Sequence, residues 1–382
     1  MSTFATMDAR GSALPLASTE AIPTPLADLH RSTGAHLGVW FGCTLPDEFG
    51  DWRAEYRFAR ESVALLDKSY RAYFDFTGPD RVRYLNAILT NNIKDLRENY
   101  GVASLFLNPQ GHIQAEIETY ALADKLFSVS FATIRERLIA ALDKYIIMDD
   151  VTLTDRTADY ATLALEGPQA SAIANELANV DLSSLASLEF REAPINAIPC
   201  RLVNRSTAAQ PGTHPIFGAE FLVERANAPA LWQILRDAAR AHAGGPAGYT
   251  ALNALRLEQG VPWFSYDFGE KQIPHEAGLQ DSHISYTKGC YTGQEIVERV
   301  RSRGQVNRTR VTLKIEATDL PAANTPLLSD DKEFGYITRA AFSPALNAII
   351  AAAYLRREKS APNSRLTLPT GATATVISPP LK

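Results

Sequence analysis

The chain has 382 residues, of which 46% are hydrophobic and 21% are charged, with 22 glycines and 22 prolines. These proportions are those of folded proteins, and they exclude a disordered chain, a collagen-like chain and a small disulfide scaffold. A single core stops growing at about 250–300 residues, so the length predicts two or three packed units. The formal net charge of −5 argues against a whole-protein attraction to nucleic acid or to an anionic membrane. We therefore expect any anion-binding site to be local.

The cysteines and the N-terminal stretch indicate the compartment. Cys43, Cys200 and Cys290 are few and far apart, which is typical of a reducing compartment. No run of 18 or more apolar residues occurs, so the sequence predicts no membrane-spanning helix. Residues 1–28 lack the basic start and compact apolar centre of a secretory signal. We interpret residues 1–28 as a mobile tail and expect a cytoplasmic protein.

The first predicted elements are a strand, a turn and a helix. The apolar segment at 73–76 predicts a strand that runs into a turn at 78–80. Val82, Leu85 and Leu89 then recur at helical spacing and predict a helix.

A β-hairpin is predicted next. Residues 104–107 and 112–122 flank a turn that reads Asn-Pro-Gln-Gly, and apolar residues alternate with polar ones in the second strand. The alternation places Glu116 on the same face as Gln114 and Glu118. We expect this face to point toward water.

The following region continues to alternate strands with helices. Strands are predicted at 160–165 and 217–223. A helix is predicted from Pro168 to Leu177, and an amphipathic helix over 230–241. Antiparallel pairs dominate, so the sequence predicts an α+β fold.

Beyond Arg308 the helical spacing disappears. Short strand candidates follow one another, and Pro, Asn, Asp and Gly separate them. We expect residues 306–382 to form a small antiparallel β-barrel.

Common motifs for nucleotide and metal sites are absent from the sequence. It contains no GxGxxG, no GxxxxGK[ST], no HExxH and no CxxC pair. The seven histidines lack metal-ligand spacing, so the sequence predicts no metal site. A redox enzyme, a kinase and a zinc hydrolase therefore lose their usual support.

One segment carries a specific signature. Residues 288–295 read KGCYTGQE, and the chain there resembles the folate-binding YgfZ proteins, which are related to the glycine-cleavage T protein. Less specific matches are GPDRVRYLNAILTNNI at 78–93, LNPQG at 107–111, ALEGPQA at 164–170 and the C-terminal barrel. The resemblance implies a three-unit disc, with two intertwined α+β units over 29–305 that hold tetrahydrofolate in a central channel. It also implies a part in assembling or maintaining iron–sulfur proteins.

Glu258 is the first candidate folate ligand. It lies within the apolar frame of Leu255, Leu257 and Val261, so its carboxylate is expected to be mostly buried. A buried carboxylate can accept the ring N–H and the exocyclic amine of a pterin as a pair. The resemblance implies this role through the matching R-L-E stretch. An exposed glutamate at a helix end is the alternative.

The glycine-framed segment around Cys290 is the second candidate. Gly289 and Gly293 permit a ligand to approach the backbone closely, although a tight turn explains them equally. Lys288 can neutralise an anionic ligand and favour the thiolate of Cys290, whose alternative is a small buried hydrophobe. Gln294 orients the ligand or makes a structural hydrogen bond. The residues expected to bind the cofactor are Glu258, Lys288, Gly289, Tyr291, Gly293, Gln294 and Arg299.

Arginines follow this segment closely. In an extended segment Arg299, Arg301 and Arg303 would lie on one face and could hold the glutamate tail of folate or a phosphate. The alternative is a solvated face paired with Glu295 and Glu298. Arginines in this number do not make a nucleic-acid site.

The sequence also departs from the T-protein pattern. The family supplies an Asp-Asp pair that assists the tetrahydrofolate amine, and this chain has Ala115-Glu116 there. Asn92 likewise stands where the family commonly has Asp. Only Glu116 can therefore replace a member of the acidic pair.

Two functions follow, and whether the protein is an enzyme is left open. The favoured one is a tetrahydrofolate-binding accessory protein for iron–sulfur cluster assembly or maintenance, in which Cys290 serves the activity. Its partners would be a reduced folate and iron–sulfur proteins or their assembly machinery. The alternative is a folate-dependent aminomethyl or methyl transferase with Glu116 as general base. A folded module without a small-molecule ligand is a third interpretation.

Overall fold

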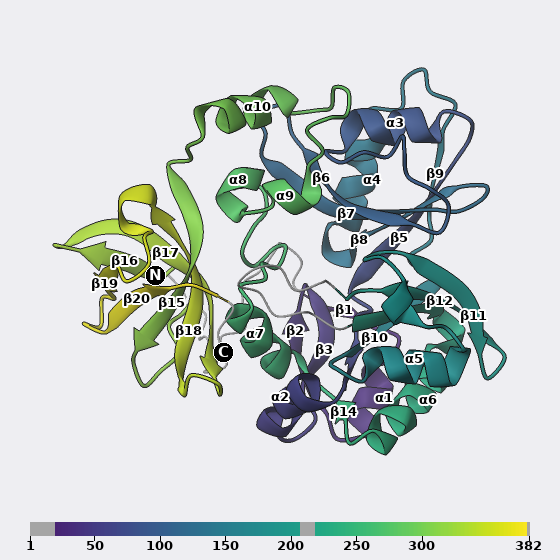
Figure 1. The fold of residues 1–382 in the computed structure, drawn as a ribbon, viewed down its shortest axis with the longest axis horizontal. Coiled ribbons are helices and arrows are strands. Elements are labelled where there is room, and N and C mark those ends of the chain that lie inside the picture. Colours follow the sequence, from purple (N-terminus) through teal and green to yellow (C-terminus); the bar gives the residue numbers. More distant parts are fainter. Residues whose placement is uncertain (1–19, 207–217, 380–382) are drawn as a thin grey trace.

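The computed structural model describes residues 20–206 and 218–379. In Figure 1 a β-barrel lies on one side of the molecule, and two lobes built around open sheets lie on the other. Helix α7 (Tyr249–Glu258), in the green part of the chain, lies between the barrel and these lobes. The predicted α+β fold with a C-terminal barrel is confirmed.

The first described elements lie earlier in the chain than the sequence predicts. The first elements are β1 (Ile22–Pro23), α1 (Ala27–Ser32), β2 (His36–Trp40) and β3 (Cys43–Glu48). They form a small sheet with the order β1-β3-β2. Leu26 is fully buried, and its burial anchors this segment. The prediction that residues 1–28 form a mobile tail is therefore wrong for residues 22–28. Residues 1–19 lie outside the described part of the chain.

The first lobe is built on an antiparallel sheet. Its strands are β5 (Arg71–Thr77), β6 (Gly101–Leu107), β7 (Ile113–Ala121), β8 (Leu126–Phe131) and β9 (Thr152–Asp155). They are arranged in the order β6-β7-β8-β5-β9. Its helices are α3 (Arg81–Ile88), η1 (Ala132–Ile134) and α4 (Arg135–Asp143). The predicted strand, helix and hairpin of this region are confirmed.

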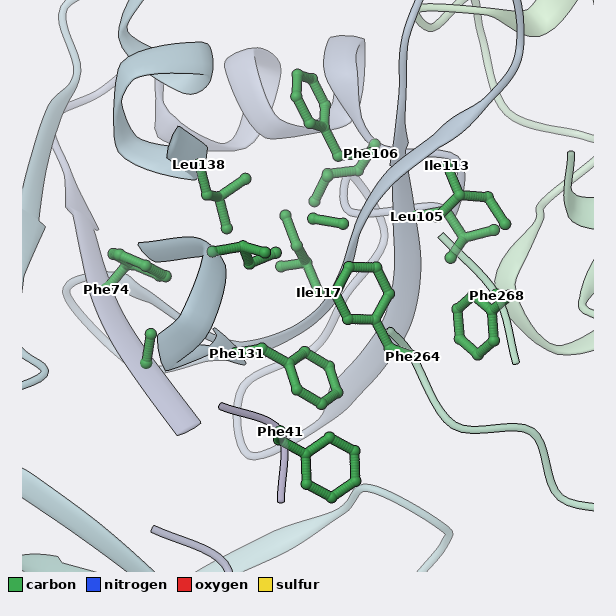
Figure 2. Close-up of a cluster of buried hydrophobic side chains, with 14 of the residues drawn as sticks. Phe41, Phe74, Leu105, Phe106, Ile113, Ile117, Phe131, Leu138, Phe264 and Phe268 are labelled. Atoms are coloured by element: carbon green, nitrogen blue, oxygen red, sulfur yellow. The ribbon is translucent and has the colours of Figure 1, made fainter. Parts of the chain in front are cut away.

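The core of this lobe joins segments that are far apart in the sequence. Figure 2 shows Phe41, Phe131 of β8 and Phe264 among the buried side chains of the cluster. The ring centroids of Phe131 and Phe264 are 4.8 Å apart, and those of Phe41 and Phe131 are 5.7 Å apart. Contacts of this kind hold the segment after residue 260 against the first lobe, because aromatic side chains bury large apolar areas.

The second lobe contains a larger sheet. Its strands are β4 (Ala64–Asp67), β10 (Tyr160–Glu166), β11 (Phe190–Ile195), β12 (Ile198–Asn204), β13 (Gly218–Glu224) and β14 (Gly245–Pro246). They are arranged in the order β11-β12-β13-β10-β4-β14. Its helices are α2 (Trp52–Glu61), α5 (Ala170–Ala178), η2 (Leu182–Ser184), η3 (Arg225–Asn227), α6 (Ala228–Ala241) and α7 (Tyr249–Glu258). Phe217, the first residue of the predicted strand, lies outside the described residues.

The C-terminal unit is a closed barrel. Its strands are β15 (Arg308–Glu316), β16 (Pro326–Ser329), β17 (Lys332–Ser343), β18 (Ala348–Arg356), β19 (Arg365–Thr367) and β20 (Thr373–Ile377), with η4 (Arg357–Lys359) between β18 and β19. The cyclic order is β15-β18-β17-β16-β19-β20. Helix α7 contacts β17 and β18 and so joins the barrel to the two lobes. Residues 380–382 lie outside the described chain.

The connection between α7 and the barrel contains three short helices. They are α8 (Pro274–Ala277), α9 (Gln280–His283) and α10 (Gln294–Arg303). The interpretation of 299–303 as an extended segment is therefore wrong. In the helix, Arg299 and Arg303 share a face but Arg301 does not, because residues four apart are neighbours on a helix. Within the described residues, no helix has the length and apolarity needed to cross a membrane.

Candidate functional site

A cavity of about 760 Å³ lies where the two sheet lobes, helix α7 and helix α9 meet. Strands β5, β7, β8 and β10 contribute wall residues from both sheets. Residues 255–264 and the end of α9 form further parts of the wall. The fold therefore brings segments about 200 residues apart in the chain around one hollow.

Part of the cavity wall is aromatic. Phe41, Tyr70, Phe131, Trp263 and Phe264 line it. The rings of Phe41 and Tyr70 stack with centroids 4.2 Å apart. Such a wall offers flat apolar surfaces against which a planar ring can pack.

Another part of the wall is a network of alternating charges. Arg71 lies 3.0 Å from Glu220 and 3.3 Å from Glu118, and Lys68 lies 3.1 Å from Glu220. Lys68 also pairs with Glu166 at 2.7 Å. Four of these five residues line the cavity, whereas Glu220 does not.

Two acidic members of this network, Glu118 and Glu220, have a lowered pKa. Burial by itself raises the pKa of Glu220, but the neighbouring guanidinium groups of Arg205 and Arg71 lower it well below its ordinary value. The same two arginines outweigh burial at Glu118 and lower its pKa. Oppositely charged neighbours thus compensate the desolvation of the carboxylates.

The expectation that Glu118 faces water is wrong. Glu118 is only 8% exposed, and its carboxylate accepts a hydrogen bond from Tyr120 at 2.9 Å. Strand β7 lies between β6 and β8, and the second lobe covers the face that carries Glu118. Alternation reports which residues share a face, but the tertiary packing decides whether water reaches that face.

Glu116 also lines the cavity, and it has a histidine partner. Its Oε1 lies 3.0 Å from Nε2 of His283 at the end of α9. The other ring nitrogen of His283, Nδ1, lies 2.7 Å from Oγ of Ser282. The side chain of Glu116 is 25% exposed, so its carboxylate is accessible from the cavity. A carboxylate in this position can accept a proton from a bound ligand.

Glu258 lines the same cavity. It is 1% exposed, so the burial that its apolar frame predicts is confirmed. Its Oε2 accepts hydrogen bonds from Tyr56 at 2.8 Å and from Arg60 at 3.0 Å. Its Oε1 accepts one from Ser343 of the barrel at 2.5 Å. Glu258 therefore joins α2, α7 and the barrel, and its carboxylate is already well supplied with donors.

The glycine-framed segment 288–295 lies elsewhere. Among the described residues that line the cavity there is none from 284–303. The Nζ of Lys288 donates to the backbone carbonyls of Asn86 in the last turn of α3 and of Leu89 and Asn91 just beyond it. Burial lowers the pKa of Lys288 to about 8. Lys288 thus supplies donors to carbonyl groups at a helix end.

Gly293 is required by a close approach of two turns. It has φ of 81° directly before α10, and a Cβ there would lie 2.7 Å from the carbonyl oxygen of Asn108. Gly289 has open space around its Cα. The tight-turn alternative therefore describes Gly293 well, since only glycine fits both the left-handed backbone and the contact.

The remaining predicted residues of this segment differ in exposure. Cys290 is exposed, whereas Tyr291 is buried with its ring 5.2 Å from the Nζ of Lys288. Gln294 is the first residue of α10. Arg299 is half-exposed and pairs with Glu295 one helical turn away at 2.6 Å. The structure therefore brings Glu116 and Glu258 to one cavity but does not bring Cys290 to it.

Two residues at or next to the cavity, His283 and Glu220, are not predicted as site residues from the sequence. His283 has no metal-ligand spacing, and only the fold brings it to Glu116. Glu220 carries a usable signal, because it is the only charge of β13 before Glu224 at the end of the strand. A charge in a buried strand needs a partner, so it marks a site where other charges must converge. Among the described residues, no group of three or more His, Cys, Asp or Glu could hold a metal ion.

Comparison with known families defines the class of protein. Residues 26–283 match the GCVT N-terminal domain, and residues 308–382 match the glycine cleavage T-protein C-terminal barrel domain. The chain therefore belongs to the glycine cleavage T-protein family. The predicted resemblance is confirmed at this level, and the narrower YgfZ branch stays a prediction.

Individual relatives cover nearly the whole chain. An aminomethyltransferase of Rubrobacter xylanophilus is 29% identical over 336 residues, which are 88% of this chain and 87% of the relative. An aminomethyltransferase of Moorella thermoacetica is 29% identical over 332 residues, which are 86% and 88% of the two chains. The crystal structure of the glycine cleavage system aminomethyltransferase T from Bartonella henselae superimposes with a TM-score of 0.82 at 21% identity. It covers 94% of this chain and 97% of its own. This structural likeness supports the fold.

Proposed function

We propose that the protein is a tetrahydrofolate-dependent one-carbon transferase of the aminomethyltransferase type. The observation that carries the proposal is the cavity of about 760 Å³ into which Glu116 presents a carboxylate beside an aromatic wall. The relatives named as aminomethyltransferases, matched over most of the chain, support the same activity.

The residues of the cavity fit a reduced folate. A volume of about 760 Å³ lies in the range of pockets that hold drug-sized ligands. The ring pair of Phe41 and Tyr70 suits a planar pterin, and the cationic groups of Lys68 and Arg71 suit anionic ligand groups. The buried Nε of Arg71 has no hydrogen-bond partner among the described residues. Such a donor is suited to a ligand, because a buried polar group without a partner is unfavourable.

Tetrahydrofolate, when bound, supplies the amine nitrogens that accept the one-carbon unit. Glu116 can accept the proton that such a nitrogen releases when its new bond to carbon forms. It can then return that proton to the amine of the donor, which leaves as ammonia when its bond to the carbon breaks. The bond from this carbon to sulfur breaks when the second folate nitrogen bonds to the carbon, and the proton of that nitrogen leaves with the thiol. Positioned general bases of this kind contribute about 10²–10⁴-fold to a rate.

Two measurements test the proposal. Calorimetric titration should detect binding of tetrahydrofolate to the full chain. Turnover should be followed as methylenetetrahydrofolate formed from tetrahydrofolate and an S-aminomethyl thiol, with thiol and ammonia as the other products. Glu116→Gln should lower turnover at least about 100-fold while the affinity changes less than about threefold. Glu176→Gln, which alters an exposed glutamate on α5, is the matched control. Absence of binding contradicts the proposal, and binding without turnover eliminates the transferase.

The predicted folate role of Glu258 belongs to the same proposal. Its position in the cavity wall supports the role, while its hydrogen bonds to Tyr56, Arg60 and Ser343 support a structural one. Glu258→Ala separates the two. A folate ligand predicts loss of tetrahydrofolate affinity in protein that remains folded. A structural role predicts a lower stability with affinity retained in the folded fraction.

The predicted folate roles of the 288–299 residues are tested in parallel. If the cavity holds the folate, Lys288→Met and Arg299→Ala should leave the affinity unchanged, because neither residue lines it. A loss of affinity in either variant, measured on folded protein, would support a folate contact at a separate surface formed by Lys288, Gly289, Tyr291, Gly293, Gln294 and Arg299.

The exposed thiol of Cys290 supports a second candidate, a folate-binding accessory protein for iron–sulfur cluster assembly or maintenance. An accessible thiol can reach a partner protein, which a thiol buried in the core cannot. The test is the activity of iron–sulfur enzymes in a deletion strain that carries Cys290→Ala. The candidate predicts lost complementation for this variant and normal complementation for Thr287→Ala in the same segment. Equal complementation by both variants would contradict the role of the thiol.

A further inference from the structure

A chain of three side chains ends at Glu116. Ser282 Oγ lies 2.7 Å from Nδ1 of His283, and Nε2 of His283 lies 3.0 Å from Oε1 of Glu116. All three residues line the cavity. A carboxylate only accepts hydrogen bonds, so the contact with Glu116 requires a proton on Nε2 of His283. In the neutral imidazole, Nδ1 then accepts the hydroxyl proton of Ser282.

The histidine is itself held firmly. Its side chain is only 11% exposed, and its backbone carbonyl accepts a hydrogen bond from Oγ1 of Thr90 at 2.6 Å. Thr90 is fully buried, and its Oγ1 accepts a hydrogen bond from the backbone N–H of Leu105 in β6 at 2.8 Å. The backbone of His283 is therefore tied to the sheet that carries Glu116.

Glutamate has three rotatable side-chain bonds, so an isolated glutamate on a cavity wall samples several positions. The contact with His283 restricts these positions through Oε1. In the described part of the chain no partner occupies Oε2 of Glu116, so this oxygen is available to a ligand. Restraint through one oxygen and exposure of the other is the arrangement that a positioned base needs.

We propose that His283 is a positioning residue that orients Glu116 toward the one-carbon acceptor by donating an Nε2–H hydrogen bond to Oε1. The inference rests on the proposed transferase function and deepens it. His283 acts through the carboxylate and is not itself a catalytic residue.

Three variants test this role in the full chain. His283→Ala removes the donor, and His283→Gln retains an N–H donor at a similar reach. The control is His242→Ala, which removes a histidine that lies 2.9 Å from Glu176 on the second lobe, away from the cavity. Turnover with the S-aminomethyl thiol and the affinity for tetrahydrofolate are measured for each variant.

We expect His283→Ala to lower kcat about tenfold or more with tetrahydrofolate affinity within about twofold of wild type. His283→Gln should recover kcat to within about threefold of wild type, and His242→Ala should match wild type. Wild-type kcat in His283→Ala overturns the inference. A kcat in His283→Gln as low as that of His283→Ala also overturns it, because an orienting donor is then insufficient.

A second readout does not depend on turnover. Histidine side-chain nitrogen NMR of protein labelled with ¹⁵N-histidine, assigned by the signal lost in His283→Gln, reports which ring nitrogen carries the proton. We expect the Nε2–H form, and a change of this signal in Glu116→Gln. An Nδ1–H form overturns the inference even if wild type turns over. The Nε2–H form in a wild type that shows no turnover contradicts the proposed function, and the proposed positioning role is overturned with it.

Discussion

Ser343, the last residue of β17 in the barrel, donates a hydrogen bond of 2.5 Å to Glu258, the last residue of α7. Both residues are almost completely buried, with exposures of 0% and 1%. The carboxylate that lines the cavity is thus also one of the points where the barrel is attached. The attachment of the barrel and the shape of the cavity are therefore coupled.

Removal of the Ser343 hydroxyl should destabilise the protein. Ser343→Ala deletes the donor to Glu258 and the acceptor of the Leu346 backbone N–H. We expect the free energy of unfolding to fall by about 2 kcal/mol, because buried polar groups lose partners. Denaturant unfolding measures this. Ser302→Ala, an exposed serine on α10, is the control and should change little. Equal stability of the two variants would contradict the coupling.

The charge network should make stability depend on pH in acid. The pKa of Glu118 and that of Glu220 are lower in the folded chain than in the unfolded chain. Their contribution is therefore fully present above the unfolded pKa of about 4.3 and is lost as the pH falls toward the folded values. Equilibrium unfolding between pH 7 and pH 3 measures the slope.

Glu220→Gln should weaken this pH dependence and lower stability at pH 7 by about 3 kcal/mol, since breaking a buried pair leaves uncompensated charge. Lys68, Arg71 and Arg205 would be the cations affected. Glu295→Gln, whose side chain is 82% exposed, serves as the control. A Glu220→Gln variant with the wild-type slope would refute the assignment of the acid dependence to this network.

Lys288 should make the stability of the protein depend on pH in alkaline solution. Burial lowers its pKa from 10.5 to about 8, so the folded chain releases this proton before the unfolded chain does. The unfolded state then binds more protons between these values, and this group makes stability rise with pH over that window. Lys288→Met should remove this rise.

The same variant should lower stability at pH 7 by about 2 kcal/mol, because three backbone carbonyls lose their donor. Lys144→Met, on the exposed end of α4, is the matched control. Unfolding curves at pH 7, 8 and 10 distinguish the variants. Identical pH dependence in wild type and Lys288→Met would disprove the assignment.

Thiol labelling should report one reactive cysteine. Cys290 is exposed, whereas burial raises the pKa of Cys43 to about 12 and that of Cys200 to about 11. Iodoacetamide at pH 8 should therefore modify one thiol per folded chain rapidly, and mass spectrometry should locate it at Cys290. Cys290→Ser should remove the rapid phase. Rapid labelling of Cys43 or Cys200 in folded protein would contradict their burial.

Much of the fold is predictable because it depends on local pattern. Helical spacing in α3, alternation in β7 and the change to short strands beyond Arg308 are properties of neighbouring residues. The apolar frame of α7 likewise predicts correctly that Glu258 is buried. The sequence does not predict the elements that begin at β1, because a single buried residue, Leu26, gives too weak a periodic signal.

For the candidate site, the sequence and the tertiary structure determine different properties. The sequence alone determined which residues can do chemistry, namely the carboxylates of Glu116 and Glu258 and the thiol of Cys290, because reactivity belongs to the side chain. Only the tertiary structure decided which of them meet. Packing of the two sheets and α9 brings Glu116, Glu258 and His283 around one cavity, while Gly293 packs on the 108–111 turn and leaves Cys290 at the surface. Proximity between distant segments arises from burial of shared apolar surface, which no local spacing encodes.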